Sequence, residues 1–159
     1  MPTAPLIDFD RIDLSAPIVS MDEVRKVCKQ RGEMEMLDGI LHFDLESDFA
    51  VGFKEVRSDD WWAPVHIPGR PIFPGTLMIE GAAQLATFHF IHRRPDLEGV
   101  FVGFGGVNNT RFRAAVEPDC RLILAARCDR MRSRMFTYKT QGFVDRTLVF
   151  ESEVMGVVV

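Results

Sequence analysis

The 159-residue chain has only three cysteines, and none of them forms a Cys-x-x-Cys pair. An odd number of scattered thiols, Cys28, Cys120 and Cys128, fits reduced cysteines better than a disulfide framework. The first residues lack the basic start and apolar core of a secretory signal. No apolar run approaches the length of a membrane span. These absences predict a soluble, cytoplasmic protein.

Neither sign of charge dominates the chain. The formal net charge is −4, which gives a nucleic-acid partner no global electrostatic support. The last third is nevertheless rich in arginine; most of these side chains are expected to be solvated on exposed strands, although the run also suits an acidic partner. The residues are Arg111, Arg113, Arg121, Arg127, Arg130, Arg132 and Arg134.

Common cofactor and metal motifs are also missing. There is no His-Glu-x-x-His, phosphate-binding loop or Gly-x-Gly-x-x-Gly, and the glycine-rich run at 103–106 has the wrong spacing for a dinucleotide site. His42, His89 and His92 form no obvious set of metal ligands. His89 lies between two phenylalanines and is interpreted as a satisfied core or interface histidine. We predict no metal and no bound cofactor.

The order of apolar patterns predicts one α+β domain at 20–159, preceded by an irregular arm at 1–19 whose Ile7, Phe9 and Ile12 pack on the body. A long helix, apolar on nearly all sides, should be buried within a curved antiparallel sheet. The capping-box spacing from Ser20 predicts a short first helix that ends near Gly32. The other expected elements are strands at 33–45 and 49–56, the long helix at 76–93, and strands at 99–108, 121–131, 134–142 and 146–157.

One stretch, VHIPGRPIFPGTLMIE from Val65 to Glu80, combines groups suited to acid–base chemistry. His66 precedes two rigid Pro-Gly turns, and a histidine suits a general base. The helix starting near Gly75 offers free amides for a polarised carbonyl oxygen. Glu80 lies within the apolar helix, with Gln84 on the same face to orient it. On residues alone, a structural role for His66 is the commoner outcome; a buried unpaired glutamate is harder to explain.

The longer segment HIPGRPIFPGTLMIEGAAQ resembles the signature of the hot-dog-fold 3-hydroxyacyl-(acyl-carrier-protein) dehydratases, of the FabZ and FabA type. Weaker likeness extends to Asp38 and to the segment VNNTRFRAAVEP. The resemblance implies a hot-dog fold, in which a curved antiparallel sheet wraps around a long central helix. The matching positions are His66, Pro68, Gly69, Pro71, Pro74, Gly75, Leu77, Glu80 and Gln84.

The resemblance also implies a reaction and a role for each residue. His66 would remove the C2 proton of the acyl chain, and Glu80 would protonate the leaving C3 hydroxyl. The amide of Gly75 would bind the thioester carbonyl, with Gln84 in support. With a glutamate at position 80, the chain resembles the FabZ branch of the family. Members of that branch convert (3R)-3-hydroxyacyl chains to trans-2-enoyl chains.

The partners are likewise implied by the resemblance. The substrate would arrive on the phosphopantetheine arm of an acidic acyl carrier protein, which Arg111 and Arg113 would contact. A homodimer would join His66 of one subunit to Glu80 of the other, and further assembly as a trimer of dimers is left open. Candidates for the wall of the acyl tunnel, which core packing explains equally well, are Phe73, Met78, Phe88 and Phe104.

The chain departs from the family pattern in two places that bear on the substrate. The early P-H-R-x-P segment is replaced by KQRGEME, and the V-x-P-G-D turn reads VEPDC, with Asp119 in place of glycine. Two alternatives therefore remain. One is a thioesterase of the same fold, in which the helix carboxylate activates water; the other is a non-catalytic acyl-binding subunit.

Overall fold

The computed structural model describes residues 3–159 and contains two α-helices and six strands among them. The helices are α1 (Met21–Val27) and α2 (Gly75–Arg93), and short 3₁₀ turns occupy Gly32–Met34 and Pro95–Leu97. The strands are β1 (Gly39–Asp44), β2 (Phe49–Val56), β3 (Val102–Phe112), β4 (Cys120–Met131), β5 (Met135–Val144) and β6 (Thr147–Val158).

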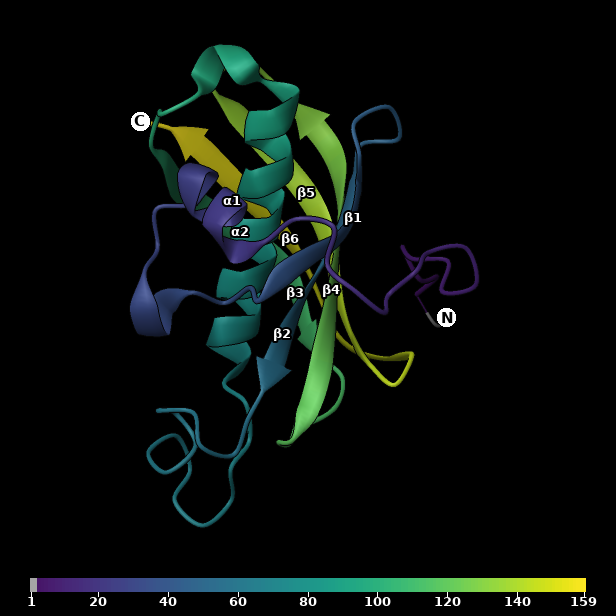
Figure 1. The fold of residues 1–159 in the computed structure, drawn as a ribbon, viewed down its shortest axis with the longest axis vertical. Coiled ribbons are helices and arrows are strands. Elements are labelled where there is room, and N and C mark those ends of the chain that lie inside the picture. The colour runs from purple at the N-terminus through teal and green to yellow at the C-terminus, as the bar shows by residue number, and fades with distance from the viewer. Residues whose placement is uncertain (1–2) are drawn as a thin grey trace.

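The six strands form one antiparallel sheet in the order β1-β2-β4-β5-β6-β3. The sheet curves around α2, which runs along its inner face (Figure 1). Side chains alternate along each strand, so Leu122 and Leu124 of β4 face α2, whereas Ile123 and Ala125 face outward. This arrangement is the hot-dog fold that the sequence predicted.

The apolar composition of α2 determines its central place. Pro74 precedes the first turn and Pro95 follows the last residues, which bounds the helix at both ends. Leu85, Phe88 and Phe90 are fully buried. A helix with so little polar surface is stable only where protein covers most of its sides, and here the sheet and α1 do so.

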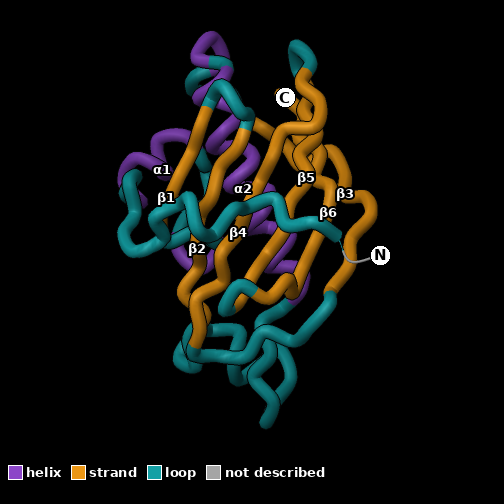
Figure 2. The backbone as a smooth tube through the Cα atoms, turned by 90° about the vertical axis from the view of Figure 1, so that its right-hand side faces the viewer, coloured by secondary structure: helices purple, strands orange, loops and turns teal. Residues whose placement is uncertain are grey.

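The outer face of the sheet is covered by the N-terminal arm. In the view of Figure 2 the arm crosses the strands on the side away from α2. Ile7, Phe9 and Ile12 pack there against sheet residues such as Phe143, as the sequence predicted. Gln141 holds the arm in place, because its side chain accepts a hydrogen bond from the Leu6 N–H (2.6 Å) and donates one to the Ala4 carbonyl (3.0 Å).

We expect Ile7→Ala to lower the free energy of unfolding by about 2–4 kcal/mol, because it leaves a cavity beneath the arm. Ile7 is only 2% exposed. The matched control is Ile18→Ala, since Ile18 is 61% exposed and its loss should cost less than about 0.5 kcal/mol. Urea denaturation of both variants measures the difference; equal costs would contradict the packing of the arm.

Local predictions were wrong at the first helix and at the first strand. Ser20 makes no side-chain hydrogen bond at the start of α1, and α1 ends at Val27, well before Gly32. The backbone of Cys28 is extended, and its thiol donates to the Gln84 carbonyl of α2 (3.4 Å). At this point the contact of Cys28 with α2 takes the place of a further turn of α1. For the same reason β1 begins only at Gly39, after a segment that lies against α2.

Candidate active site

His66 lies on a long loop, 57–74, that extends beyond the end of the sheet (Figure 1). The loop is anchored by Trp62, which is buried and packs edge-to-face on Phe73 with ring centroids 5.2 Å apart. The His66 N–H donates to the Trp62 carbonyl (2.8 Å). Asp119 ties a neighbouring turn to the same loop, because its carboxylate accepts from the Ser58 N–H (2.8 Å). The aspartate that departs from the family pattern thus helps to fix this loop.

The hydrogen bonds of His66 define its tautomer. Its Nδ1 lies 2.7 Å from the Ile72 carbonyl oxygen. Because a carbonyl oxygen only accepts hydrogen bonds, the proton of the neutral imidazole resides on Nδ1. The Nε2 lone pair is then available, and His66 is exposed where it borders a cavity. Such an imidazole can take a proton from a bound molecule.

The cavity beside His66 has a volume of about 470 Å³ and is also lined by Gly75 at the start of α2. Among residues 3–159 the Gly75 N–H has no hydrogen-bond acceptor, whereas the Leu77 N–H already bonds to the Pro74 carbonyl. A Cβ atom at Gly75 would lie 2.6 Å from the ring of Phe112. A larger residue at position 75 would therefore have to displace that ring, which is 52% exposed.

Glu80 lines a different cavity of about 220 Å³, beside β3 and β6. Its Oε1 accepts hydrogen bonds from the side-chain amides of Gln84 (2.8 Å) and Gln30 (3.1 Å). Gln84 itself is buried, donates to the Met34 carbonyl (2.8 Å) and accepts from the Met36 N–H (3.0 Å). The carboxyl group is therefore held by two amides, one of which comes from outside the helix.

The structure brings His66 and Gly75 together but does not bring Glu80 into their cavity. Gly75 and Glu80 are five residues apart, which separates them by about 140° around an α-helix. The two cavities have no lining residue in common. Within one chain, the candidate base and the candidate acid thus border different spaces.

The four candidates for the tunnel wall are divided in the structure. Phe73 and Met78 line the cavity of His66, and Phe104 lines that of Glu80. Phe88 lines neither of them. It lies fully buried in the core and packs edge-to-face on Phe43 with centroids 5.4 Å apart. Its assignment to the tunnel wall therefore finds no support in these two cavities and stays a prediction.

The two arginines near the site differ in their contacts. Arg113 lines the cavity of His66, is paired with Glu151, and donates to the Thr3 hydroxyl (3.2 Å). Arg111 is exposed, and its guanidinium donates to the Thr110 carbonyl (2.9 Å). Within residues 3–159 Arg111 has no carboxylate partner, so its charge is less neutralised than that of Arg113.

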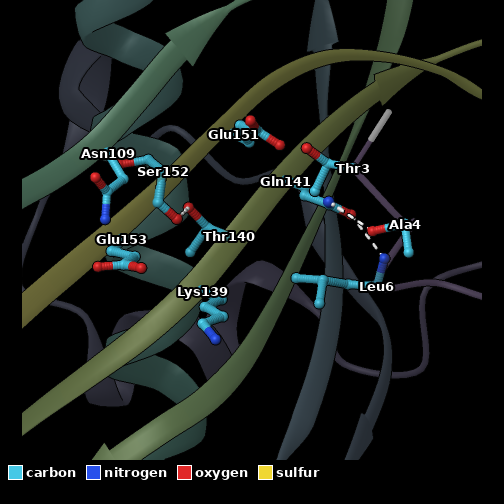
Figure 3. A pocket seen from close by; sticks show the side chains of 10 residues that line it. All are labelled: Thr3, Ala4, Leu6, Asn109, Lys139, Thr140, Gln141, Glu151, Ser152 and Glu153. Atoms are coloured by element: carbon cyan, nitrogen blue, oxygen red, sulfur yellow. Dashed lines mark hydrogen bonds between the residues drawn. The ribbon is translucent and has the colours of Figure 1, made fainter. Parts of the chain in front are cut away.

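A third cavity, of about 390 Å³, lies on the outer face between the arm and strands β5 and β6 (Figure 3). Gln141 and its two bonds to the arm form one side of it. Glu151, which pairs with Arg113, is also part of its lining. The lining of this cavity includes none of His66, Gly75 and Glu80, so it is distinct from the two cavities of the candidate site.

His89 is a buried histidine near the end of α2. Its Nε2 donates to the Asp44 carbonyl (3.0 Å), and its Nδ1 accepts from the Tyr138 hydroxyl (2.6 Å). Both nitrogens are therefore satisfied, which confirms the prediction of a core histidine. Burial lowers the pKa of His89 from its usual value of 6.5.

This lowered pKa predicts a pH-dependent stability. Below pH 6.5 the unfolded chain binds a proton at His89 more readily than the folded protein, so the free energy of unfolding falls as the pH decreases. His89→Gln keeps a donor and an acceptor but cannot titrate. Urea denaturation at about pH 7.5 and 5.5 should therefore give a smaller difference for the variant than for the wild type. Equal differences would show that His89 does not contribute.

Within residues 3–159 no group of three or more His, Cys, Asp or Glu side chains could hold a metal ion. The absence of a cofactor stays a prediction. No helix in the same residues has both the length and the hydropathy needed to cross a membrane.

Comparison with known proteins shows which family the chain resembles. The model of the FabA-like domain matches residues 29–153. Among curated proteins, the chain is similar to the 3-hydroxyacyl-(acyl-carrier-protein) dehydratase FabZ of Desulfotalea psychrophila, with 34% identity over 122 residues, 76% of this chain and 81% of the relative. It is also similar to the enzyme of that name from Herpetosiphon aurantiacus, with 31% identity over 142 residues, 89% of this chain and 99% of the relative.

Solved structures resemble the chain in fold. One is the dehydratase heterocomplex ApeI:P from Xenorhabdus doucetiae, with a TM-score of 0.73, 14% identity, and coverage of 86% of this chain and 90% of that one. Another is a hypothetical thioesterase with coenzyme A from Streptococcus pneumoniae, with a TM-score of 0.56, 11% identity, and coverage of 76% and 84%. At these identities the likeness supports the fold alone.

Proposed function

The chain belongs to the FabA-like domain family, and from this membership we propose that it dehydrates 3-hydroxyacyl chains carried on an acyl carrier protein. The product is the trans-2-enoyl thioester, and the substrate is the (3R) epimer. The similarity to FabZ enzymes over most of the chain supports this activity in fatty-acid or related acyl-chain synthesis. The cytoplasm, where soluble carriers supply such substrates, is the proposed location.

The reaction assigns one step to each of three groups. Nε2 of His66 takes the proton from C2, and the electron pair of that C–H bond forms the C2–C3 double bond. Glu80 gives its proton to the C3 hydroxyl, which leaves as water. The Gly75 N–H hydrogen-bonds the thioester carbonyl, on which negative charge develops as the C2 proton departs. Return of the proton from His66 to Glu80 through solvent restores the enzyme.

One observation carries the proposal: His66 offers a lone pair in the same cavity as an unpaired helix amide. The tautomer is set by the bond from Nδ1 to the Ile72 carbonyl, and the Gly75 N–H lacks an acceptor within residues 3–159. A base beside a donor for an oxyanion is what proton removal next to a carbonyl requires. A thioesterase that uses only the helix carboxylate would leave this arrangement of His66 unexplained.

The site is proposed to form between two copies of the chain. His66 and Glu80 border separate cavities in one chain, so a substrate that meets both requires a second chain. The edge strand β3 suits such an interface, because among the described residues it pairs with β6 alone. It also exposes large apolar rings, with Phe104 and Phe112 each 52% exposed.

The acyl carrier is proposed to approach the cavity of His66. Arg111 lies next to this cavity in sequence and keeps a charge that no carboxylate within residues 3–159 neutralises. A guanidinium group in this position attracts the acidic surface of a carrier and chiefly increases the rate of association. Arg113 is paired with Glu151 and is expected to contribute less.

The purified protein tests the proposal directly with a short trans-2-enoyl thioester. The reverse reaction, hydration, removes the conjugated absorbance, and chiral analysis of the product should give the (3R) alcohol. Release of free thiol with the double bond intact would favour the thioesterase instead. If the double bond and the thioester both stayed intact, on carrier-bound substrates as well, the proposal would be overturned in favour of an acyl-binding subunit.

A further inference from the structure

Gln30 lies between α1 and β1, in a segment that is attached to α2 at both ends. At one end the thiol of Cys28 donates to the Gln84 carbonyl (3.4 Å). At the other end the side-chain amide of Gln84 donates to the Met34 carbonyl (2.8 Å). The segment is thereby held along α2. Within this segment, Gln30 reaches Glu80, although the two residues are 50 positions apart in sequence.

Both hydrogen bonds to Glu80 reach the same oxygen. Nε2 of Gln84 lies 2.8 Å from Oε1, and Nε2 of Gln30 lies 3.1 Å from it. The orientation of the Gln84 amide is independently determined, because its own Oε1 accepts a bond from the Met36 N–H (3.0 Å). An NH₂ group only donates, so Oε1 of Glu80 is an acceptor whether or not the carboxyl group carries a proton.

It follows that the transferable proton of Glu80 is on Oε2. Within residues 3–159 no donor contacts that oxygen. We propose that Gln30 is a positioning residue for Glu80: together with Gln84 it occupies Oε1, keeps the acidic proton on Oε2, and aims Oε2 at the leaving hydroxyl. This inference rests on the proposed dehydration, in which Glu80 is the acid.

The two amides also act on the barrier of the reaction. As the proton leaves Oε2, negative charge develops on the carboxyl group and spreads to Oε1. Hydrogen bonds to a charged acceptor are stronger than those to a neutral one. The bonds from Gln30 and Gln84 are therefore stronger in the transition state than in the bound substrate complex, and this difference accelerates the step.

Gln30 can be tested separately from the fold, whereas Gln84 cannot. Gln84 is buried and bonds to two backbone groups of the neighbouring segment, so its loss would disturb the structure. Gln30 is only partly buried and lines the cavity of Glu80. Within residues 3–159, the bond to Glu80 is the only hydrogen bond of its side chain. Lys29, the exposed residue before it, provides a matched control in the same segment.

The experiment compares wild type with Gln30→Met, Gln30→Glu and Lys29→Met in the dehydration of a 3-hydroxyacyl thioester, followed by the rise of conjugated absorbance. Methionine keeps the size of the side chain but cannot donate, so kcat should fall about tenfold while KM changes less than about twofold. With one donor fewer, Glu80 holds its proton to a higher pH. The limb of the kcat profile that reports the loss of this proton should therefore move to higher pH.

Gln30→Glu extends the same series. A second carboxyl group beside Glu80 retains a shared proton to still higher pH, so the limb should move farther than in Gln30→Met. Lys29→Met should match the wild type in kcat and in pH profile, and thermal unfolding verifies that each variant is folded. A purely structural role for Gln30 would lower stability without the graded shift in pH, and that result would overturn the inference.

The outcomes separate this inference from the proposed function. An active wild type with an unchanged kcat and pH profile in both Gln30 variants would reject the positioning role and leave dehydration in place. A wild type without activity on any 3-hydroxyacyl thioester would reject the proposed function, and the role of Gln30 with it. An active wild type with a graded shift supports both.

Discussion

His66→Ala is expected to lower kcat for dehydration by about 1000-fold, because it removes the base that takes the C2 proton. The Gly75 amide and Glu80 remain, which accounts for the residual rate. The side chain of His66 is exposed, and within residues 3–159 it bonds only to the Ile72 carbonyl, so the variant should fold normally. The measurement is the rise of conjugated absorbance from a 3-hydroxyacyl thioester under saturating conditions.

The control for this result is another histidine. His42 lies on β1, where its ring is tilted against Phe49 with centroids 6.0 Å apart. It borders neither candidate cavity. His42→Ala should therefore retain kcat within about twofold. If His66→Ala also stayed within tenfold of the wild type, the C2 proton would have to go to another group, and the assignment of the base would fail.

Mixing two inactive variants is expected to restore activity, if each site takes one group from each chain. His66→Ala lacks the base, and Glu80→Gln lacks the acid. In a mixed dimer, one site receives both defects and the other receives neither. Random exchange makes about half of the dimers mixed, each with one intact site of two, so about one quarter of the wild-type activity should return.

This complementation has a direct control and a clear opposite outcome. Mixing His66→Ala with the double variant His66→Ala/Glu80→Gln should restore nothing, because no chain then supplies the base. Differently tagged chains, purified in sequence, establish that mixed dimers have formed. Mixed dimers without recovered activity would place His66 and Glu80 of one chain in the same site, despite their separate cavities.

The sequence predicted most of the fold because its signals are local. Strand β2 begins and ends where the alternating pattern does, at Phe49 and Val56, and α2 differs from the expected helix by one residue. Apolar periodicity and Pro-Gly turns are patterns that extend over only a few residues, so they can be recognised in the sequence itself. The end of α1 could not be predicted in this way. It depends on a contact of Cys28 with α2, and the two bonded residues are 56 positions apart in sequence.

The same distinction applies to the candidate site. The bond between Gln84 and Glu80 was foreseeable, since residues four apart share a helix face. The tautomer of His66 depends on how the loop returns to Ile72, and no pattern in the sequence specifies that. Gln30 was missed altogether. Its segment was noted only as a departure from the family pattern, and its contact with Glu80 exists only once α1 and α2 have packed.

The order of the strands has a consequence for how the chain folds. Among the described residues, β3 pairs only with β6, which follows both β4 and β5 in sequence. Without Thr147–Val158, β3 has no partner strand within residues 3–159, and Phe112 is not held over the start of α2. The pairing of β3 therefore depends on a contact between segments that are distant in sequence, and such contacts form slowly. Deletion of Thr147–Val158 would remove the strand that holds β3, and would leave the cavity of His66 without its Phe112 wall.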